Sequence, residues 1–282
     1  MKDRLHIGLV VNPLAGLGGT LALKGSDGEQ VRELAESLGE ESLDRAVERA
    51  RRALAPLEDA IHAGVVRVSC WNGLMGEAVL DALGLPCKVY GGDRGGLSDS
   101  GDTRAAASEL VRHGVDLLVF AGGDGTARDV FDALGSDFPV LGIPAGVKMH
   151  SGVFAVSPEA AGELLLQLVQ GGLVGLTDRE VRDIDEEAFR HDQVRSRYYG
   201  DMQVPGEGRF LQHTKVGGRE STELVAAEIA SWIAESMEPG RLYLVGPGST
   251  TAAIMEELGL DNTLLGVDVV RDRELLAADA DE

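Results

Sequence analysis

Lysine is scarce in this 282-residue sequence, which contains only Lys2, Lys24, Lys88, Lys148 and Lys215. Acidic residues outnumber basic ones by 47 to 26, which gives a formal net charge of −21. This excess of negative charge disfavours nucleic acid or an anionic membrane surface as the main partner. Few basic side chains are available to contact an anionic ligand. A lysine beside a glycine loop is therefore a stronger candidate for such a contact than it would be in a lysine-rich chain.

Long hydrophobic runs are also absent, and the sequence has only two cysteines. No stretch of about 18 apolar residues occurs, so no transmembrane helix is predicted. The apolar N-terminal stretch runs into Asn12-Pro13, which is typical of a β-strand and not of a signal peptide. Cys70 and Cys87 have no partners at zinc-site spacing and fit a reducing compartment. We therefore expect a cytoplasmic protein.

Strand-like and helix-like segments alternate through the first 171 residues. Strands are expected at 6–11, 65–71, 87–90, 115–121 and 139–143, and helices at 29–38, 42–54, 76–83, 102–112, 126–134 and 158–169. This alternation predicts an α/β fold, with a mostly parallel sheet covered by helices on both faces.

The alternation changes after Gly171. Two β-segments with charged faces are followed by a helix at 221–235, then by a strand, a glycine turn and a further helix, and by a final strand before a polar end. We expect two domains, at residues 1–171 and 172–282, the second of α/β or α+β type.

The stretch FAGGDGT, residues 120–126, ends a strand-like run with glycines and then begins a helix. In an open parallel sheet, ligands bind beyond the carboxyl ends of the strands. Glycines leave backbone N–H groups bare, and the helix adds its N-terminal partial charge, so the pattern favours a phosphate. The predicted phosphate-binding residues are Gly122, Gly123, Gly125 and Thr126. The alternative is a plain turn in which Asp124 and Thr126 cap the helix.

A second strand-like run ends in Ile-Pro-Ala-Gly, and a rare lysine follows at once. Here Gly146, Lys148, His150 and Ser151 are predicted to contact phosphate, although a histidine considered alone is more often a packed or solvent-facing residue. The first strand ends at Asn12, before a glycine-rich stretch that is either a ligand-binding loop or an ordinary surface loop. If this stretch binds the ligand, the ends of the three strands would converge on one crevice.

Two further stretches lie in the second half. GPGSTT, residues 246–251, combines a glycine turn with hydroxyl side chains, which predicts an anion site at Gly248, Ser249 and Thr250 or else simple helix capping. DIDEEAFR, residues 183–190, offers Asp183 and Asp185 as magnesium ligands, and a solvated charged face is the alternative.

Taken in order, these stretches resemble the ATP-NAD kinase family, in particular the branch with the acetoin-catabolism X proteins and the polyphosphate- or ATP-dependent NAD kinases. The resemblance covers nearly the whole chain, from GLVVNPLAGLGG through FAGGDGTARDV and GIPAGVKMHSGVFAVSP to EVRDIDEEAFR and GPGSTTAAIMEELGL. GGDGT alone is shared with lipid kinases, whereas AGVKMHS combined with DIDEEAFR is far more specific. The resemblance implies an N-terminal domain of the NAD kinase and diacylglycerol kinase type.

The resemblance also implies an enzyme that transfers a phosphoryl group from ATP or polyphosphate, with Mg²⁺, to the 2′-OH of NAD. Asp124 would then activate the acceptor hydroxyl, and we expect nucleotides as partners and a homo-oligomer. A kinase for a small sugar or polyol is one alternative, and a nucleotide-binding regulator of a catabolic pathway with little turnover is another. Members of the branch usually continue beyond DVVRD into a glycine-rich segment, so a short or truncated second domain is expected.

Overall fold

The computed structural model describes residues 4–16, 44–92, 98–146, 149–172, 175–184, 196–206, 211, 222–263 and 266–280. The chain divides into two compact units, Met1–Thr214 and Lys215–Glu282, and each is described by itself.

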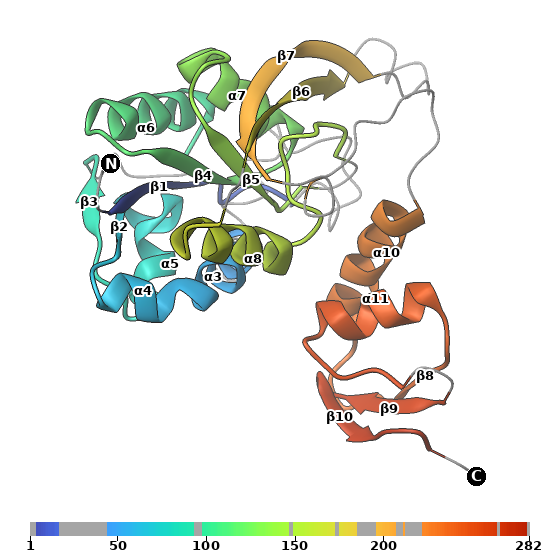
Figure 1. The fold of residues 1–282 in the computed structure, drawn as a ribbon. Helices are drawn as coiled ribbons and strands as arrows, with labels where there is room; N and C mark the ends of the chain where they lie inside the picture. The colour runs from blue at the N-terminus through green and yellow to red at the C-terminus, as the bar shows by residue number, and fades with distance from the viewer. Residues whose placement is uncertain are drawn as a thin grey trace. The chain divides into compact units, whose positions relative to one another are not determined.

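The first unit is built on a five-stranded parallel sheet with the strand order β3-β2-β1-β4-β5 (Figure 1). Its strands are β1 (Leu5–Val11), β2 (Val66–Trp71), β3 (Lys88–Tyr90), β4 (Leu117–Gly122) and β5 (Val140–Pro144). In the central strand β1, Leu9 pairs with Cys70 of β2 on one side and with Val119 of β4 on the other. The strands β4 and β5 are buried along their whole length, as expected for a sheet covered on both faces. The predicted fold class is confirmed.

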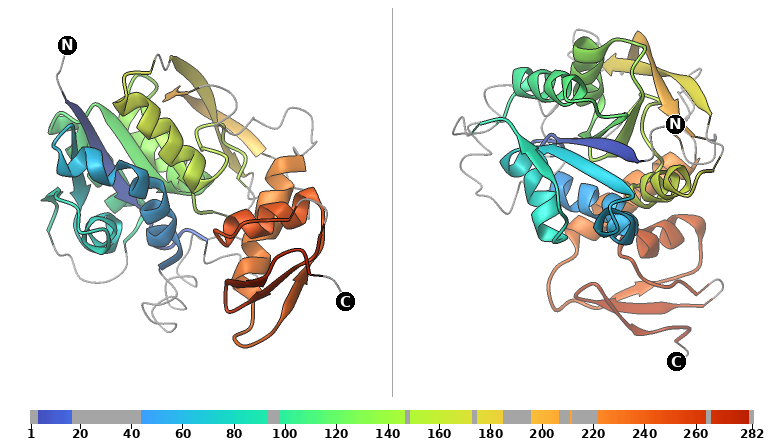
Figure 2. Two further views of the ribbon diagram at one scale, coloured as in Figure 1. Left: turned by 60° about the horizontal axis from the view of Figure 1, so that its bottom comes forward. Right: turned by 60° about the vertical axis from the view of Figure 1, so that its left-hand side comes forward.

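Helices cover both faces of this sheet (Figures 1 and 2). One face carries α6 (Ser100–Arg112) and α7 (Asp124–Leu134), and the other carries α3 (Asp44–Leu54), α5 (Glu77–Ala82) and α8 (Pro158–Val169). The short α4 (Glu58–His62) and the 3₁₀ turns η2 (Ala55–Leu57) and η3 (Gly73–Met75) complete the connections. The helix expected at 29–38 lies outside the described residues. Helix α7 begins at Asp124, two residues before the predicted start, and this places Asp124 in its first turn.

An antiparallel ribbon, β6 (Leu176–Ile184) and β7 (Ser196–Pro205), packs on α7. Gly200 lies against the ring of Phe131, where any side chain would overlap the ring. The Tyr199 hydroxyl donates a hydrogen bond of 2.7 Å to Asp132 Oδ1. These contacts join the ribbon to the helix layer of the parallel sheet, and both belong to the first compact unit, Met1–Thr214. The expected domains at residues 1–171 and 172–282 stay a prediction.

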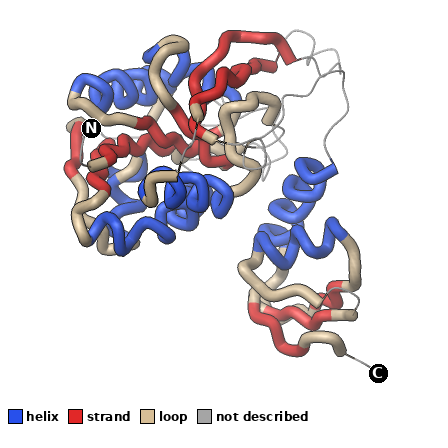
Figure 3. The backbone as a smooth tube through the Cα atoms, viewed as in Figure 1, coloured by secondary structure: helices blue, strands red, loops and turns tan. Residues whose placement is uncertain are grey.

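The second unit contains α10 (Thr222–Ser236), α11 (Ser249–Glu257) and an antiparallel sheet of β8 (Tyr243–Val245), β9 (Asp268–Arg271) and β10 (Glu274–Ala277) (Figure 3). Val245, Met255 and Val270 form its small core. Strand β10 was not predicted, and it lies between the last predicted strand and the polar end of the chain. It forms because Asp272 and Arg273 adopt φ values of 53° and 62°, which are typical of a two-residue hairpin turn. Within the described residues, no helix is long and apolar enough to span a membrane.

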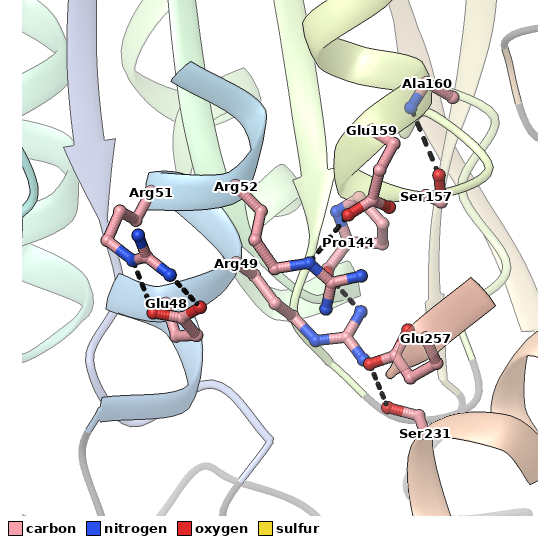
Figure 4. A network of polar contacts seen from close by, with 10 residues as sticks. All are labelled: Glu48, Arg49, Arg51, Arg52, Pro144, Ser157, Glu159, Ala160, Ser231 and Glu257. Atoms are coloured by element: carbon pink, nitrogen blue, oxygen red, sulfur yellow. Dashed lines mark hydrogen bonds and ion pairs between the residues drawn. The ribbon is translucent and has the colours of Figure 1, made fainter. Parts of the chain in front are cut away.

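Helix α8 begins with a side-chain cap. Ser157 Oγ accepts a hydrogen bond of 3.1 Å from the N–H of Ala160, and Pro158 occupies the first helical position (Figure 4). Ser157→Ala leaves that N–H without its acceptor, so we expect the free energy of unfolding to fall by about 1 kcal/mol in urea denaturation. Ser157→Asp is the control and should keep near-normal stability, because aspartate caps equally well. An alanine variant as stable as the wild type would contradict the role of the cap.

Candidate active site

The carboxyl ends of β1, β4 and β5 lie at one edge of the parallel sheet. β1 and β4 are neighbours, but the chain continues from β1 toward β2 and from β4 toward β5, so the strand order reverses between them. Such a switch point is the place where open α/β sheets bind ligands. The three strand ends are thus neighbours in the sheet, and their convergence on one ligand crevice stays a prediction.

Asn12 joins the end of β1 to the start of α7. Its backbone N–H donates to the carbonyl of Ala121 at 2.9 Å, and its side-chain Nδ2 donates to Thr126 Oγ1 at 2.9 Å. Its Oδ1 accepts a hydrogen bond of 3.0 Å from the N–H of Leu14, which turns the chain away from the strand. Asn12 and Thr126, both predicted as site residues, are therefore in direct contact.

Asp124 is the most strongly held side chain at this edge. Its Oδ2 accepts hydrogen bonds from the backbone N–H of His150 at 2.7 Å and from His150 Nδ1 at 3.2 Å. Its Oδ1 accepts a third hydrogen bond of 2.9 Å from the N–H of Ser151. The side chain is only 7% exposed. The sequence predicts His150 and Ser151 as phosphate contacts; in the structure they bind the Asp124 carboxylate, and a role at phosphate stays a prediction.

The glycines at this edge are required by packing. A methyl group on Gly122 would overlap the side chain of Thr126. A Cβ on Gly146 would lie 2.7 Å from the Cα of Gly123, so the two loops meet backbone to backbone. The N–H groups of Ala145 and Gly146 both donate to the carbonyl of Gly122, at 2.9 and 3.1 Å. The end of β5 is thereby fixed against the GGDGT turn.

Ser151 connects this edge to the ribbon. Its Oγ donates to the carbonyl of Arg182 at 3.1 Å and accepts from the N–H of Arg182 at 3.0 Å. The N–H of Gly152 donates to the carbonyl of Glu180 at 2.8 Å, which adds a second link to β6. The backbone of Asp183 follows directly and pairs with Arg197 of β7. The acidic stretch that begins at Asp183 therefore follows directly after Arg182, the residue to which Ser151 is hydrogen-bonded.

Arginine residues of α3 support the end of β5, and the sequence reasoning missed them. Arg49 is buried, and its Nη1 donates to the carbonyl of Pro144 at 3.0 Å (Figure 4). Arg52 Nε forms an ion pair of 2.6 Å with Glu159 at the start of α8. The sequence did contain a sign of these contacts, because arginines recur at helical spacing, at positions 45, 49 and 52, in a chain with few basic residues.

Several other predicted site residues lie either outside the described residues or in the second unit. Lys148 and Asp185 lie outside the described residues, as does the side chain of Asp183. Gly248, Ser249 and Thr250 belong to the second unit, where Gly248 is the N-cap of α11 and Thr251 Oγ1 donates to its carbonyl at 2.9 Å. Ser249 therefore does not cap its own helix. Across the residues that are described, no group of three or more His, Cys, Asp or Glu side chains is placed to hold a metal ion.

Comparison with known proteins gives one positive result. The model of the ATP-NAD kinase N-terminal domain matches residues 7–173, a span of more than half of the 282 residues that contains the parallel sheet, Asn12, the GGDGT turn and the His150–Ser151 loop. No curated protein matches the chain. On the strength of the domain match, and in agreement with the sheet order and the switch-point site, this chain belongs to the ATP-NAD kinase family.

Proposed function

We propose that this protein is a kinase that transfers a phosphoryl group from ATP or polyphosphate to the 2′-OH of NAD, forming NADP. The family membership supports phosphoryl transfer as the reaction type. The observation that carries the proposal is the position of Asp124, a buried carboxylate held in the first turn of α7 at the switch point of the sheet. Placement of the reacting groups and electrostatic stabilisation supply most of the catalysis in phosphoryl transfer.

In this proposal the donor phosphates lie against the GGDGT turn. The first-turn N–H groups of α7, at Gly125 and Thr126, have no acceptor inside the helix and are oriented by its dipole. They would receive phosphate oxygens beside Gly122 and Gly123. Lys148, one of the few lysines, would add a positive charge. Asp124 would serve the chemical step, either directly as a base or through the histidine that it holds.

A magnesium ion is also part of this proposal. Mg²⁺ takes oxygen ligands and is usually held by one or two carboxylates together with substrate phosphates and water. Asp183 and Asp185 would be those ligands, and the proposal is supported by the hydrogen bonds that fix Arg182 to Ser151, directly before Asp183. The bound ion would bridge donor phosphates and neutralise the charge that develops during transfer.

The finer expectations belong to the same proposal. They are the membership of the polyphosphate- or ATP-dependent branch, a cytoplasmic location, a homo-oligomeric state, and a second anion site at Gly248, Ser249 and Thr250.

The test combines product formation with ligand identification. Purified protein is incubated with NAD, Mg²⁺ and either ATP or polyphosphate, and NADP is measured by an enzymatic cycling assay. We expect NADP with at least one donor, and mass spectrometry of co-purified ligands should identify NAD or a nucleotide. A co-purified sugar phosphate together with no NADP would favour the sugar or polyol kinase. Tight nucleotide binding without transfer to any acceptor would favour the regulatory protein.

A further inference from the structure

The acceptor capacity of Asp124 is largely occupied by its own protein. A carboxylate offers about four acceptor positions, and three donors from residues 150 and 151 already use both of its oxygens. Two of these donors are backbone N–H groups, so the carboxylate is held by the chain itself and cannot turn without breaking them. Such a group is well suited to orient a neighbour and poorly suited to move toward a substrate hydroxyl.

The neighbour it orients is the imidazole of His150. An ionised carboxylate only accepts hydrogen bonds, so the contact of 3.2 Å between Nδ1 and Asp124 Oδ2 places the ring proton on Nδ1. In the neutral ring, Nε2 then carries the free lone pair. Among the described residues, none forms a hydrogen bond with Nε2. The side chain is largely enclosed and keeps 8% of its surface accessible.

Few other charged groups surround this ring in the described residues. Asp124 of α7 is its ion-pair partner. From β6, Arg182 reaches the loop through its backbone at Ser151, while its guanidinium forms an ion pair of 2.7 Å with Glu180. The Asp124 carboxylate is thus the charged group in contact with the ring. This arrangement is the orienting carboxylate–histidine pair used in nucleophile activation.

We propose that His150, held by Asp124, is the proton acceptor of the phosphoryl transfer, an assignment that rests on the proposed function. Nε2 takes the proton of the acceptor hydroxyl as its oxygen forms a bond to the terminal phosphorus of the donor. The bond from that phosphorus to the bridging oxygen breaks, and its electron pair leaves with the nucleoside diphosphate or the shortened polyphosphate. The imidazolium, stabilised by Asp124, later returns its proton to water.

The kinetic test is chemical rescue of His150→Ala. This variant keeps the backbone N–H that binds Asp124 Oδ2 and removes only the ring. We expect turnover to fall by at least about 10²-fold and added imidazole to restore it saturably. His62→Ala, in the exposed last turn of α4, is the matched control and should keep wild-type turnover without responding to imidazole. Turnover that stays near normal in His150→Ala, or that is lost and not restored by imidazole, overturns the assignment.

A spectroscopic test is independent of activity. In protein labelled with ¹⁵N-histidine, a long-range ¹H–¹⁵N correlation spectrum distinguishes the two ring tautomers. His150→Gln identifies the signal among the six histidines. We expect the wild-type ring of His150 to carry its proton on Nδ1 and this preference to weaken in Asp124→Asn, which removes the charge beside the ring. A ring protonated on Nε2 in the wild type overturns the proposal, whether or not NADP is formed. Failure to form NADP with the expected tautomer present would instead count against NAD as the acceptor.

Discussion

Asp124→Asn is expected to lower turnover by at least about 10²-fold while the nucleotide Kd changes less than about tenfold. The amide preserves size but removes the charge and replaces one acceptor oxygen with a donor. The N–H₂ group faces both donors of His150 if it takes the place of Oδ2, and the N–H of Ser151 if it takes the place of Oδ1. In either case the histidine ring loses the negative charge beside it, so the chemical step suffers more than binding does. The measurements are kcat and the nucleotide Kd under identical conditions.

The same substitution also carries a stability cost. A buried donor left without an acceptor typically costs about 1–3 kcal/mol, so earlier unfolding is expected together with the loss of turnover. Asp132→Asn is the matched control, because Asp132 lies on the same helix and binds Tyr199 and Arg104 away from the switch point. It should keep wild-type turnover. If Asp124→Asn unfolds earlier but still transfers phosphate at a near-normal rate, Asp124 is a turn residue and has no role in the chemistry.

Gly122→Ala is expected to have the largest effect on stability. The added methyl group would overlap the Thr126 side chain, which is attached to the first turn of α7 and cannot rotate out of the way. Relief requires α7 to move, and that motion breaks the 2.9 Å hydrogen bond from Asn12 to Thr126. Overpacking of this kind costs about 1–3 kcal/mol and occasionally more. Urea denaturation measures the loss, and nucleotide affinity should fall with it.

The control for this variant is Gly92→Ala. Gly92 lies in the first unit, and a Cβ there meets no atom within 4 Å. Its unfolding free energy and nucleotide affinity should match those of the wild type. If Gly122→Ala is equally stable, the close packing of the turn against Thr126 is not a determinant of the fold.

The sequence predicted the parallel sheet and its site edge because both follow from local patterns. The buried strands β4 and β5 are largely apolar runs, and glycine lies at or just after the end of each, at positions 122 and 123 for β4 and at position 146 for β5. Parallel strands then bring their carboxyl ends to one edge without further information. The start of α7 was predicted two residues late, because glycines at 123 and 125 argue locally against a helix, whereas the hydrogen bonds from residues 150 and 151 hold Asp124 in its first turn.

The contacts that sequence reasoning missed are long-range. The hydrogen bond between Asp124 and His150 joins two residues that are 26 positions apart in the sequence, and no periodic pattern of residues predicts it. The charged strand β7 likewise gives no sign in the sequence that Gly200 packs on Phe131. Strand β10 depends on a turn in which Asp272 and Arg273 both have positive φ, a conformation that this pair of residues rarely adopts.

The close packing of the glycines bears on how this motif would change during evolution. A side chain at Gly122 would overlap Thr126, and a Cβ on Gly146 would lie 2.7 Å from the Cα of Gly123. These constraints hold whether or not a nucleotide ever binds. A descendant that lost the reaction but kept the fold would still be under selection to retain Gly122 and Gly146. The histidine ring at position 150 would be released from that selection. The glycines would therefore be found in every descendant that keeps the fold, whereas a histidine at position 150 would be kept in those that retain the activity.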